Sequence, residues 1–119
     1  MDVINILEKF GLFADQWNPR IIGELNGQYV KLARIQGEFD FHHHDNEDEL
    51  FLVIKGKMAM AFRDKVVELE QGELLVVPHG VDHKPMAEEE CLIMLFEPKS
   101  TMNTGNTITP KTREKLDWI

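Results

Sequence analysis

The sequence lacks the features that mark several large classes of proteins. It has one cysteine, Cys91, so no internal disulfide can form, and the position of Cys91 in the apolar run CLIMLF predicts a buried, inert thiol. Its apolar runs are far shorter than the ~20 residues that a membrane-spanning helix needs. The first residues, MDVINILEKF, contain no basic, signal-like segment, so we expect a cytoplasmic protein.

Basic residues are also scarce. The chain has 13 lysines and arginines against 21 aspartates and glutamates, which gives a formal net charge of -8. Such a chain repels polyanions, so nucleic acid is not an expected partner. Its 119 residues, 43% of them hydrophobic, suffice for one domain with one core. We expect an N-terminal helix and turn over residues 1–20, a β-barrel over 21–98 and a C-terminal tail over 99–119.

Most of the chain has the pattern of short strands. In DVINILEKFG the apolar residues recur at helical spacing, and Asp2 and Gly11 are suited to begin and end a short helix. After it, RIIGEL and QYVKLARIQ flank Asn26-Gly27, a strong hairpin signal. Further strand-like runs are ELFLVI, KMAMAF, VVELE, ELLVVP, VDHKPM and CLIMLFE. We interpret AEEE, before the last run, as a solvated loop. Many short strands and hardly any helix predict an all-β antiparallel sandwich or barrel.

The stretch FHHHDNEDELF, residues 41–51, is the strongest candidate for a functional site. Successive side chains of a strand point to opposite faces, so His42 and His44 share a face while His43 points away. In the strand that follows, Glu49, Phe51 and Val53 lie on one face. If a hairpin brings Glu49 beside the two histidines, the donors suit a first-row divalent ion. The alternatives are a charged, solvated turn, or Glu47 or Asp48 as the carboxylate in place of Glu49.

A second block, GELLVVPHGVDHKP, adds His83 after a turn shaped by Pro78 and Gly80. Two motifs of the cupin superfamily resemble stretches of this chain: Gly37-x4-His42-x-His44-x4-Glu49-x6-Gly56 and Gly72-x5-Pro78-x-Gly80-x2-His83. The pattern of short apolar strands and turns over residues 28–98 is also similar to that of small single-domain cupins, the mannose-6-phosphate isomerase-like, cupin 2 type. This chain departs from the usual pattern in two places: four residues instead of five separate Gly37 from His42, and Ala87 stands where asparagine is common. Neither departure removes a donor.

The resemblance implies a double-stranded β-helix, or jelly roll, with a divalent transition metal (Fe, Mn, Ni or Zn) as cofactor. In cupins the motif-one histidines, the glutamate and the motif-two histidine bind the metal, and these are here His42, His44, Glu49 and His83. His43 and His79 are then non-ligands, and Phe51 and Val53 are either core residues or pocket lining. Small cupins are commonly homodimers, for which RIIGEL offers an edge strand. The final LDWI then packs either on its own barrel or on the neighbouring subunit.

The function implied is broad, since cupins include dioxygenases, decarboxylases, isomerases, lyases and non-catalytic binders. We expect a metal-dependent enzyme acting on a small oxygenated molecule, such as a dioxygenase or related oxidoreductase, with a small-molecule or sugar binder as the alternative. A sugar-phosphate isomerase is disfavoured because few cations can face the site, and Lys31 and Arg34 cannot both do so from one strand. No side-chain acid or base is evident, since Tyr29 is the only tyrosine and no buried carboxylate besides Glu49 stands out.

Overall fold

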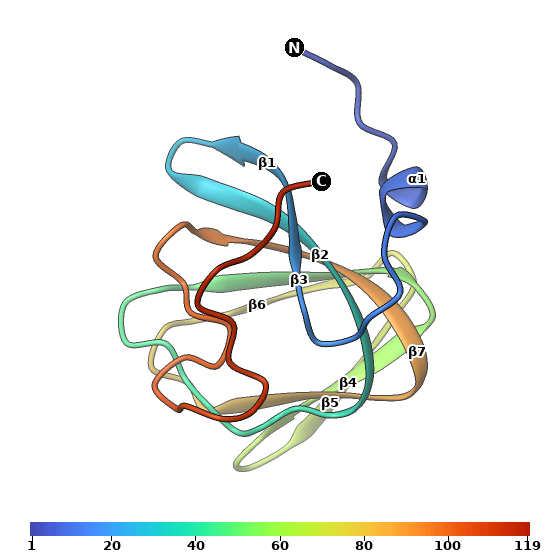
Figure 1. Cartoon of the computed structure of the whole chain (residues 1–119). Coiled ribbons are helices and arrows are strands. Elements are labelled where there is room, and N and C mark those ends of the chain that lie inside the picture. The colour runs from blue at the N-terminus through green and yellow to red at the C-terminus, as the bar shows by residue number, and fades with distance from the viewer.

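The computed structural model describes residues 1–119 and contains one short helix and seven strands (Figure 1). The helix, α1, spans Ile6–Phe10. The strands are β1 (Arg20–Leu25), β2 (Gln28–Glu38), β3 (Glu49–Lys55), β4 (Lys57–Phe62), β5 (Val66–Glu70), β6 (Leu74–Val77) and β7 (His83–Pro98). With five residues, α1 is far too short to span a membrane.

The long strand β7 joins the two halves of the sheet system. All neighbours are antiparallel, in the order β1-β2-β7-β3-β6, and β4 pairs with both β5 and β7. Because β7 bends, its first residues pair with β4 while its second half lies between β2 and β3, so the strands curl into a barrel (Figure 1). The architecture is the predicted all-β jelly roll, and the Asn26-Gly27 turn joins β1 to β2 as expected.

Two element predictions were wrong. The helix begins at Ile6 and not near Asp2, because Asn5 is the cap: its side chain accepts a hydrogen bond from the backbone N–H of Glu8 at 3.0 Å. AEEE is not a loop but the middle of β7. The pairing with β2 passes from Ile35–Cys91 to Gly37–Ala87, so the extra β7 residues form a bulge whose three glutamates remain exposed.

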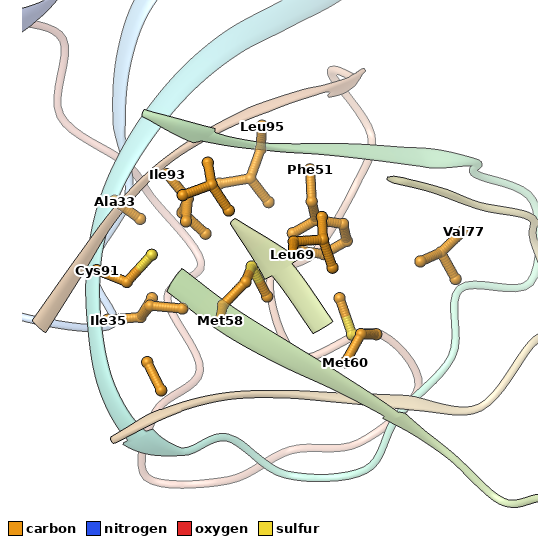
Figure 2. Close-up of a cluster of buried hydrophobic side chains, with 12 residues drawn as sticks. Ala33, Ile35, Phe51, Met58, Met60, Leu69, Val77, Cys91, Ile93 and Leu95 are labelled. Atoms are coloured by element: carbon orange, nitrogen blue, oxygen red, sulfur yellow. The ribbon is translucent and has the colours of Figure 1, made fainter. Parts of the chain in front are cut away.

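The main core fills the barrel and comes from alternate positions of its strands (Figure 2). Phe51 and Val53 of β3 face inward while their neighbours are half-buried, which is the predicted alternation. Cys91 lies fully inside this cluster, and burial raises its pKa to about 11, so the thiol stays neutral at physiological pH. A second, smaller cluster lies where α1 packs on the outer side of the sheet, around Phe10 and Leu32.

The C-terminal tail packs back on its own barrel. The backbone N–H of Ile21 donates to Asp117 at 2.9 Å, and that of Ile119 donates to Ile21 at 3.1 Å. The tail therefore occupies the edge of β1 that the sequence offered to a partner subunit. Trp118 makes an edge contact with Tyr29 but stays 54% exposed.

Candidate metal centre

Four side chains from three parts of the chain converge inside one end of the barrel. His42 and His44 come from the segment between β2 and β3, Glu49 begins β3, and His83 begins β7. The backbones of His42 and His83 exchange hydrogen bonds of 3.1 and 2.9 Å, which ties the two motifs together. All four side chains are buried, and one donor atom from each lies within 4.8 Å of the others. The sequence predicted this grouping.

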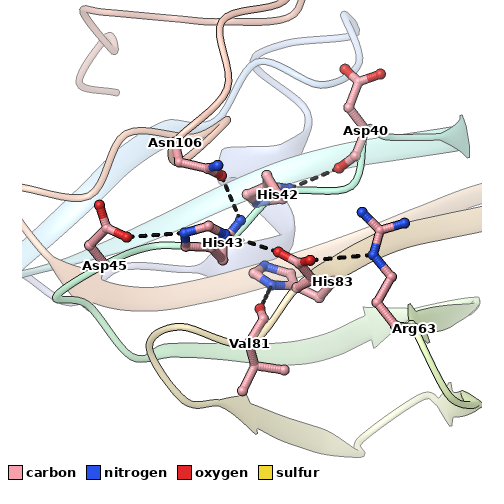
Figure 3. Close-up of polar contacts among 9 residues, drawn as sticks. Asp40, His42, His43, Asp45, Arg63, Val81, His83 and Asn106 are labelled. Carbon is pink, nitrogen blue, oxygen red and sulfur yellow. Dashed lines mark hydrogen bonds and ion pairs between the residues drawn. The ribbon is translucent and has the colours of Figure 1, made fainter.

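Backbone carbonyls fix the orientation of two of the imidazole rings (Figure 3). Nδ1 of His42 lies 2.8 Å from the carbonyl of Asp40, and Nδ1 of His83 lies 2.8 Å from that of Val81. A carbonyl only accepts hydrogen bonds, so each Nδ1 carries the proton and donates it. In a neutral ring held this way, Nε2 is left with a free lone pair, which is the state that a metal ligand requires.

His44 lacks the partners that a buried imidazole normally has. Both of its ring nitrogens are buried without a hydrogen bond, although Nε2 lies 2.8 Å from Glu49 Oε1. The same carboxylate oxygen lies 3.0 Å from His83 Nε2. Leaving a buried polar atom unpaired costs ~1–3 kcal/mol, so native proteins rarely do it without a reason. A divalent ion bonded to His44 and its three neighbours removes this cost, and the donor set fits such an ion.

The charges in the cluster also suit a cation. Burial is the main cause that lowers the pKa of His42, to about 4, so this ring is neutral at pH 7. Burial acts to raise the pKa of Glu49, but its close polar contacts with Glu97, His44 and His83 outweigh it and hold the pKa well below its usual range. Glu49 is therefore an ionised carboxylate near the neutral ring of His42.

A buried ion pair that the sequence analysis missed lies next to the cluster. Lys31 Nζ is 2.7 Å from Glu97 Oε1, and both side chains are about as buried as the core. Burial and the adjacent Glu49 raise the pKa of Glu97 well above its usual range. Glu97 is thus a second buried carboxyl group, which was not evident from the sequence. Alternation along β7 could have indicated that Glu97 is buried, because Cys91, Ile93 and Leu95 face inward and Glu97 is the next residue in that series.

The remaining charged residues of the His-rich segment lie outside the cluster. His43 faces away, with Nδ1 2.9 Å from Asp82 and Nε2 3.0 Å from Asp45 (Figure 3), and the hydrogen bond to Asp82 is the main cause that raises its pKa. His79 pairs with the exposed Asp48 at 2.8 Å. Glu47 accepts a hydrogen bond from Ser100. None of these carboxylates reaches the buried donors, so Glu49 is the carboxylate of the cluster.

A small cavity of about 50 Å³ adjoins His42 and Glu49. Most of its wall is apolar and includes Phe51 and the stacked pair Trp17 and Phe39, whose ring centroids are 4.9 Å apart. Val53 belongs to the packed core and is not part of this wall. The polar residues that line the cavity are His42, Glu49, Glu97 and Asn103. No lysine or arginine lines it.

A strap formed by residues 101–112 packs against the His-rich segment. The backbone N–H of Asn106 donates to the carbonyl of His43 at 3.0 Å, and the Asn106 side chain accepts from the His43 N–H at 2.9 Å (Figure 3). Within the strap, Thr101 and Thr104 are buried, and Asn103 reaches the cavity wall. No motif in the sequence indicated this contact, because a polar, turn-rich tail has the composition of a solvated segment.

Comparisons with known proteins agree with this architecture. Residues 29–96 match the family model described as a cupin domain. The chain is 41% identical over 79 residues to the uncharacterized protein YdbB of Bacillus subtilis, covering 66% of this chain and 70% of that one. A cupin-2 domain protein of Shewanella frigidimarina superposes with TM-score 0.81 at 49% identity, covering 82% and 95% of the two chains. Hydroquinone 1,2-dioxygenase PnpCD, at 18% identity, TM-score 0.67 and coverages of 81% and 72%, shares the fold alone.

Proposed function

Since this chain belongs to the cupin family, we propose that it is a metal-dependent enzyme acting on a small oxygenated molecule, as a dioxygenase or related oxidoreductase. His42, His44, Glu49 and His83 hold the ion, which is iron, manganese, nickel or zinc. The observation that carries the proposal is the buried, unpaired His44 imidazole beside three further donors. The structural neighbours alone do not support a particular enzyme activity, because proteins with the same fold catalyse different reactions.

A divalent ion bound by these residues supplies a Lewis acid that takes up and polarises an oxygen-bearing ligand. The protein residues supply the rest. Glu49 contributes one negative charge, so the centre keeps a net charge of about +1 with three neutral imidazoles. The carbonyls of Asp40 and Val81 fix two rings in place. The apolar wall around Phe51 excludes water from the side on which the cavity adjoins the cluster.

Sugar-phosphate isomerisation fits this site poorly. A phosphate needs cations, and no lysine or arginine lines the cavity. The candidates are engaged elsewhere: Lys31 with Glu97, Arg34 with Glu90 and two backbone carbonyls near α1, and Lys84 with Glu38. An uncharged oxygenated ligand suits this cavity better than an anionic one.

The test is turnover by protein loaded separately with Fe²⁺, Mn²⁺, Ni²⁺ or Zn²⁺ against panels of diols, enediols, keto acids and catechols. Oxygen consumption and mass spectrometry of products are measured, with metal-treated His44→Ala/His83→Ala protein as the control. We expect at least one metal to support turnover that the variant lacks. Stoichiometric metal without turnover on any panel contradicts the enzyme, and a bound small molecule recovered unchanged favours the alternative, a non-catalytic binder.

We also propose that the chain forms a homodimer, through an outer apolar patch and not through β1. The patch is formed by Leu50, Leu52, Leu74, Val76 and Phe96 on the outer face of β3, β6 and β7. Leu74 and Val76 are 57% and 49% exposed, and they lie directly opposite Leu52 and Leu50. Helix α1 covers the neighbouring part of this face but not the patch. A two-fold axis through the patch buries it in both copies.

A further inference from the structure

The strand register places a second carboxyl group directly beside the carboxylate of the metal-ligand cluster. Leu50 of β3 pairs with Phe96 of β7. In this antiparallel ladder the next pair along is Glu49 and Glu97. Both side chains face into the barrel, where the two residues are 3% and 2% exposed. Residues opposite each other in a ladder have Cβ atoms ~4.5–5.5 Å apart, and these two carboxyl groups are in close polar contact.

Lys31 balances the charge of this carboxyl pair. Tyr29 of β2 pairs with Glu97, so Lys31, two positions further on, is a diagonal neighbour of Glu97 on the same face. Its Nζ lies 2.7 Å from Glu97 Oε1, and Lys31 is 2% exposed. One ammonium and two carboxyl groups are neutral as a set when the carboxyl groups share one proton. That proton also lets one carboxyl group donate a hydrogen bond to the other, so the two do not repel each other.

Glu49 therefore has a polar neighbour in addition to the histidines of the cluster. Its Oε1 lies 2.8 Å from His44 Nε2 and 3.0 Å from His83 Nε2. A glutamate side chain has several rotatable bonds, and a metal ligand must give up that freedom when the ion binds. Contacts with Glu97 and with the two imidazoles restrict the carboxylate beforehand. A hydrogen bond to a ligating carboxylate orients it for the ion in this way.

Building on the proposed metal-dependent function, we propose that Glu97 is a positioning residue of the metal centre, which donates a hydrogen bond that holds the Glu49 carboxylate ready for the ion. Lys31 in turn holds Glu97 and balances its charge. Glu97 is not one of the four converging donors, so it acts on the ion through Glu49. The chain of contacts runs across three neighbouring strands, from β2 through β7 to β3.

A matched pair of full-length variants tests the hydrogen bond itself. Lys31→Met/Glu97→Gln keeps an N–H donor at position 97, whereas Lys31→Met/Glu97→Leu has none, and both lack the buried ammonium. Their affinities for Co²⁺ are measured by competition with a chelating dye. We expect the glutamine variant to bind Co²⁺ ~10–100-fold more tightly than the leucine variant. Equal affinities in the two variants overturn the positioning role of Glu97.

The visible spectrum of bound Co²⁺ distinguishes positioning from a general effect on stability, because it depends on the ligands and their geometry. At saturating Co²⁺ we expect the glutamine variant to have the wild-type spectrum. The leucine variant should have an altered one, since the Glu49 carboxylate is no longer held. A wild-type spectrum in the leucine variant overturns the assignment, because the loss of Glu97 then leaves the coordination of the ion unchanged.

A crystal structure of Zn²⁺-loaded wild type tests the same contact even where a variant fails to fold. We expect Glu49 on the ion and Glu97 within hydrogen-bond distance of Glu49. Glu97 bonded directly to the ion, or no contact between the two carboxyl groups, overturns the assignment. Wild type that binds neither Co²⁺ nor Zn²⁺ refutes the proposed metal centre together with this inference, whereas metal binding that is equal in the two variants refutes only the role of Glu97.

Discussion

The imidazole of His42 is in a buried environment that disfavours its protonated form. Burial lowers its pKa from 6.5 to about 4 in the folded chain. Between these values the unfolded chain takes up a proton and the folded chain does not. The contribution of the neutral His42 ring to the free energy of unfolding is therefore fully present above pH 6.5, and it is lost progressively as the pH falls towards 4.

We expect metal-free protein to lose up to about 3 kcal/mol of unfolding free energy through His42 between pH 7 and pH 4. Urea unfolding at a series of pH values measures this. The matched control is His42→Gln, whose pH dependence over this window is shallower because position 42 no longer titrates. If the two proteins have parallel pH profiles, the ring of His42 is not held neutral by burial.

Residues 42 to 49 show how far single positions could be predicted from the sequence. Alternation along a strand sufficed to put His42 and His44 on one face, whereas Glu49 joined them only through the resemblance to the cupin motifs, with Glu47 and Asp48 left as alternatives. The pair formed by Lys31 and Glu97 was out of reach, because its members are 66 positions apart and on different strands. Each has a weak signal of its own, a charged residue at an inward-facing position, but only the pairing of β2 with β7 shows that they meet.

The strap of residues 101–112 is held at one crowded point. Gly105 has φ +58, and a Cβ there lies 2.2 Å from the carbonyl oxygen of His43 and 3.0 Å from His42 Cδ2. Gly72 has a similar positive φ of +83, but a Cβ there meets nothing within 4 Å. The cost of Gly72→Ala therefore measures backbone strain alone. Gly105→Ala adds a steric clash with the His43 backbone, which is relieved only if the strap moves away.

We expect Gly72→Ala to cost about 1 kcal/mol of unfolding free energy, and Gly105→Ala to cost clearly more. Because the added Cβ would press on the His42 ring, Gly105→Ala should also weaken metal binding, while Gly72→Ala should not. Thermal unfolding and competition with a chelating dye measure the two effects. Equal costs for both substitutions, with unchanged metal affinity, would show that the strap does not support the site.

Strands and turns could be predicted where residues close together in the sequence determine their conformation. The Asn26-Gly27 turn has both residues at positive φ, as the hairpin requires, and the strands of the barrel follow their apolar alternation. The bulge in β7 was not predictable, because three consecutive glutamates have the composition of a loop and only pairing with β2 keeps them in a strand. The late start of α1 likewise depends on Asn5 capping in place of Asp2.

At the scale of the whole molecule, the proposed homodimer depends on the outer apolar patch. We expect light scattering to give twice the chain mass of 13.8 kDa at micromolar concentration. Leu74→Lys should give a monomer, because a charge in the centre of a buried patch is costly to desolvate. The control is Val66→Lys on β5, which is equally exposed but lies outside the patch. A wild-type monomer, or dissociation by both substitutions alike, contradicts this interface.

The central claim is that the four buried donors hold one divalent ion, and elemental analysis of purified, untagged protein tests it most directly. His44→Ala/His83→Ala protein prepared in parallel is the control. We predict close to one equivalent of iron, manganese, nickel or zinc per wild-type chain, and its loss from the variant. No metal in wild type, even after reconstitution, or equal metal in both proteins, would contradict the account and leave a cupin barrel whose buried histidines serve another purpose.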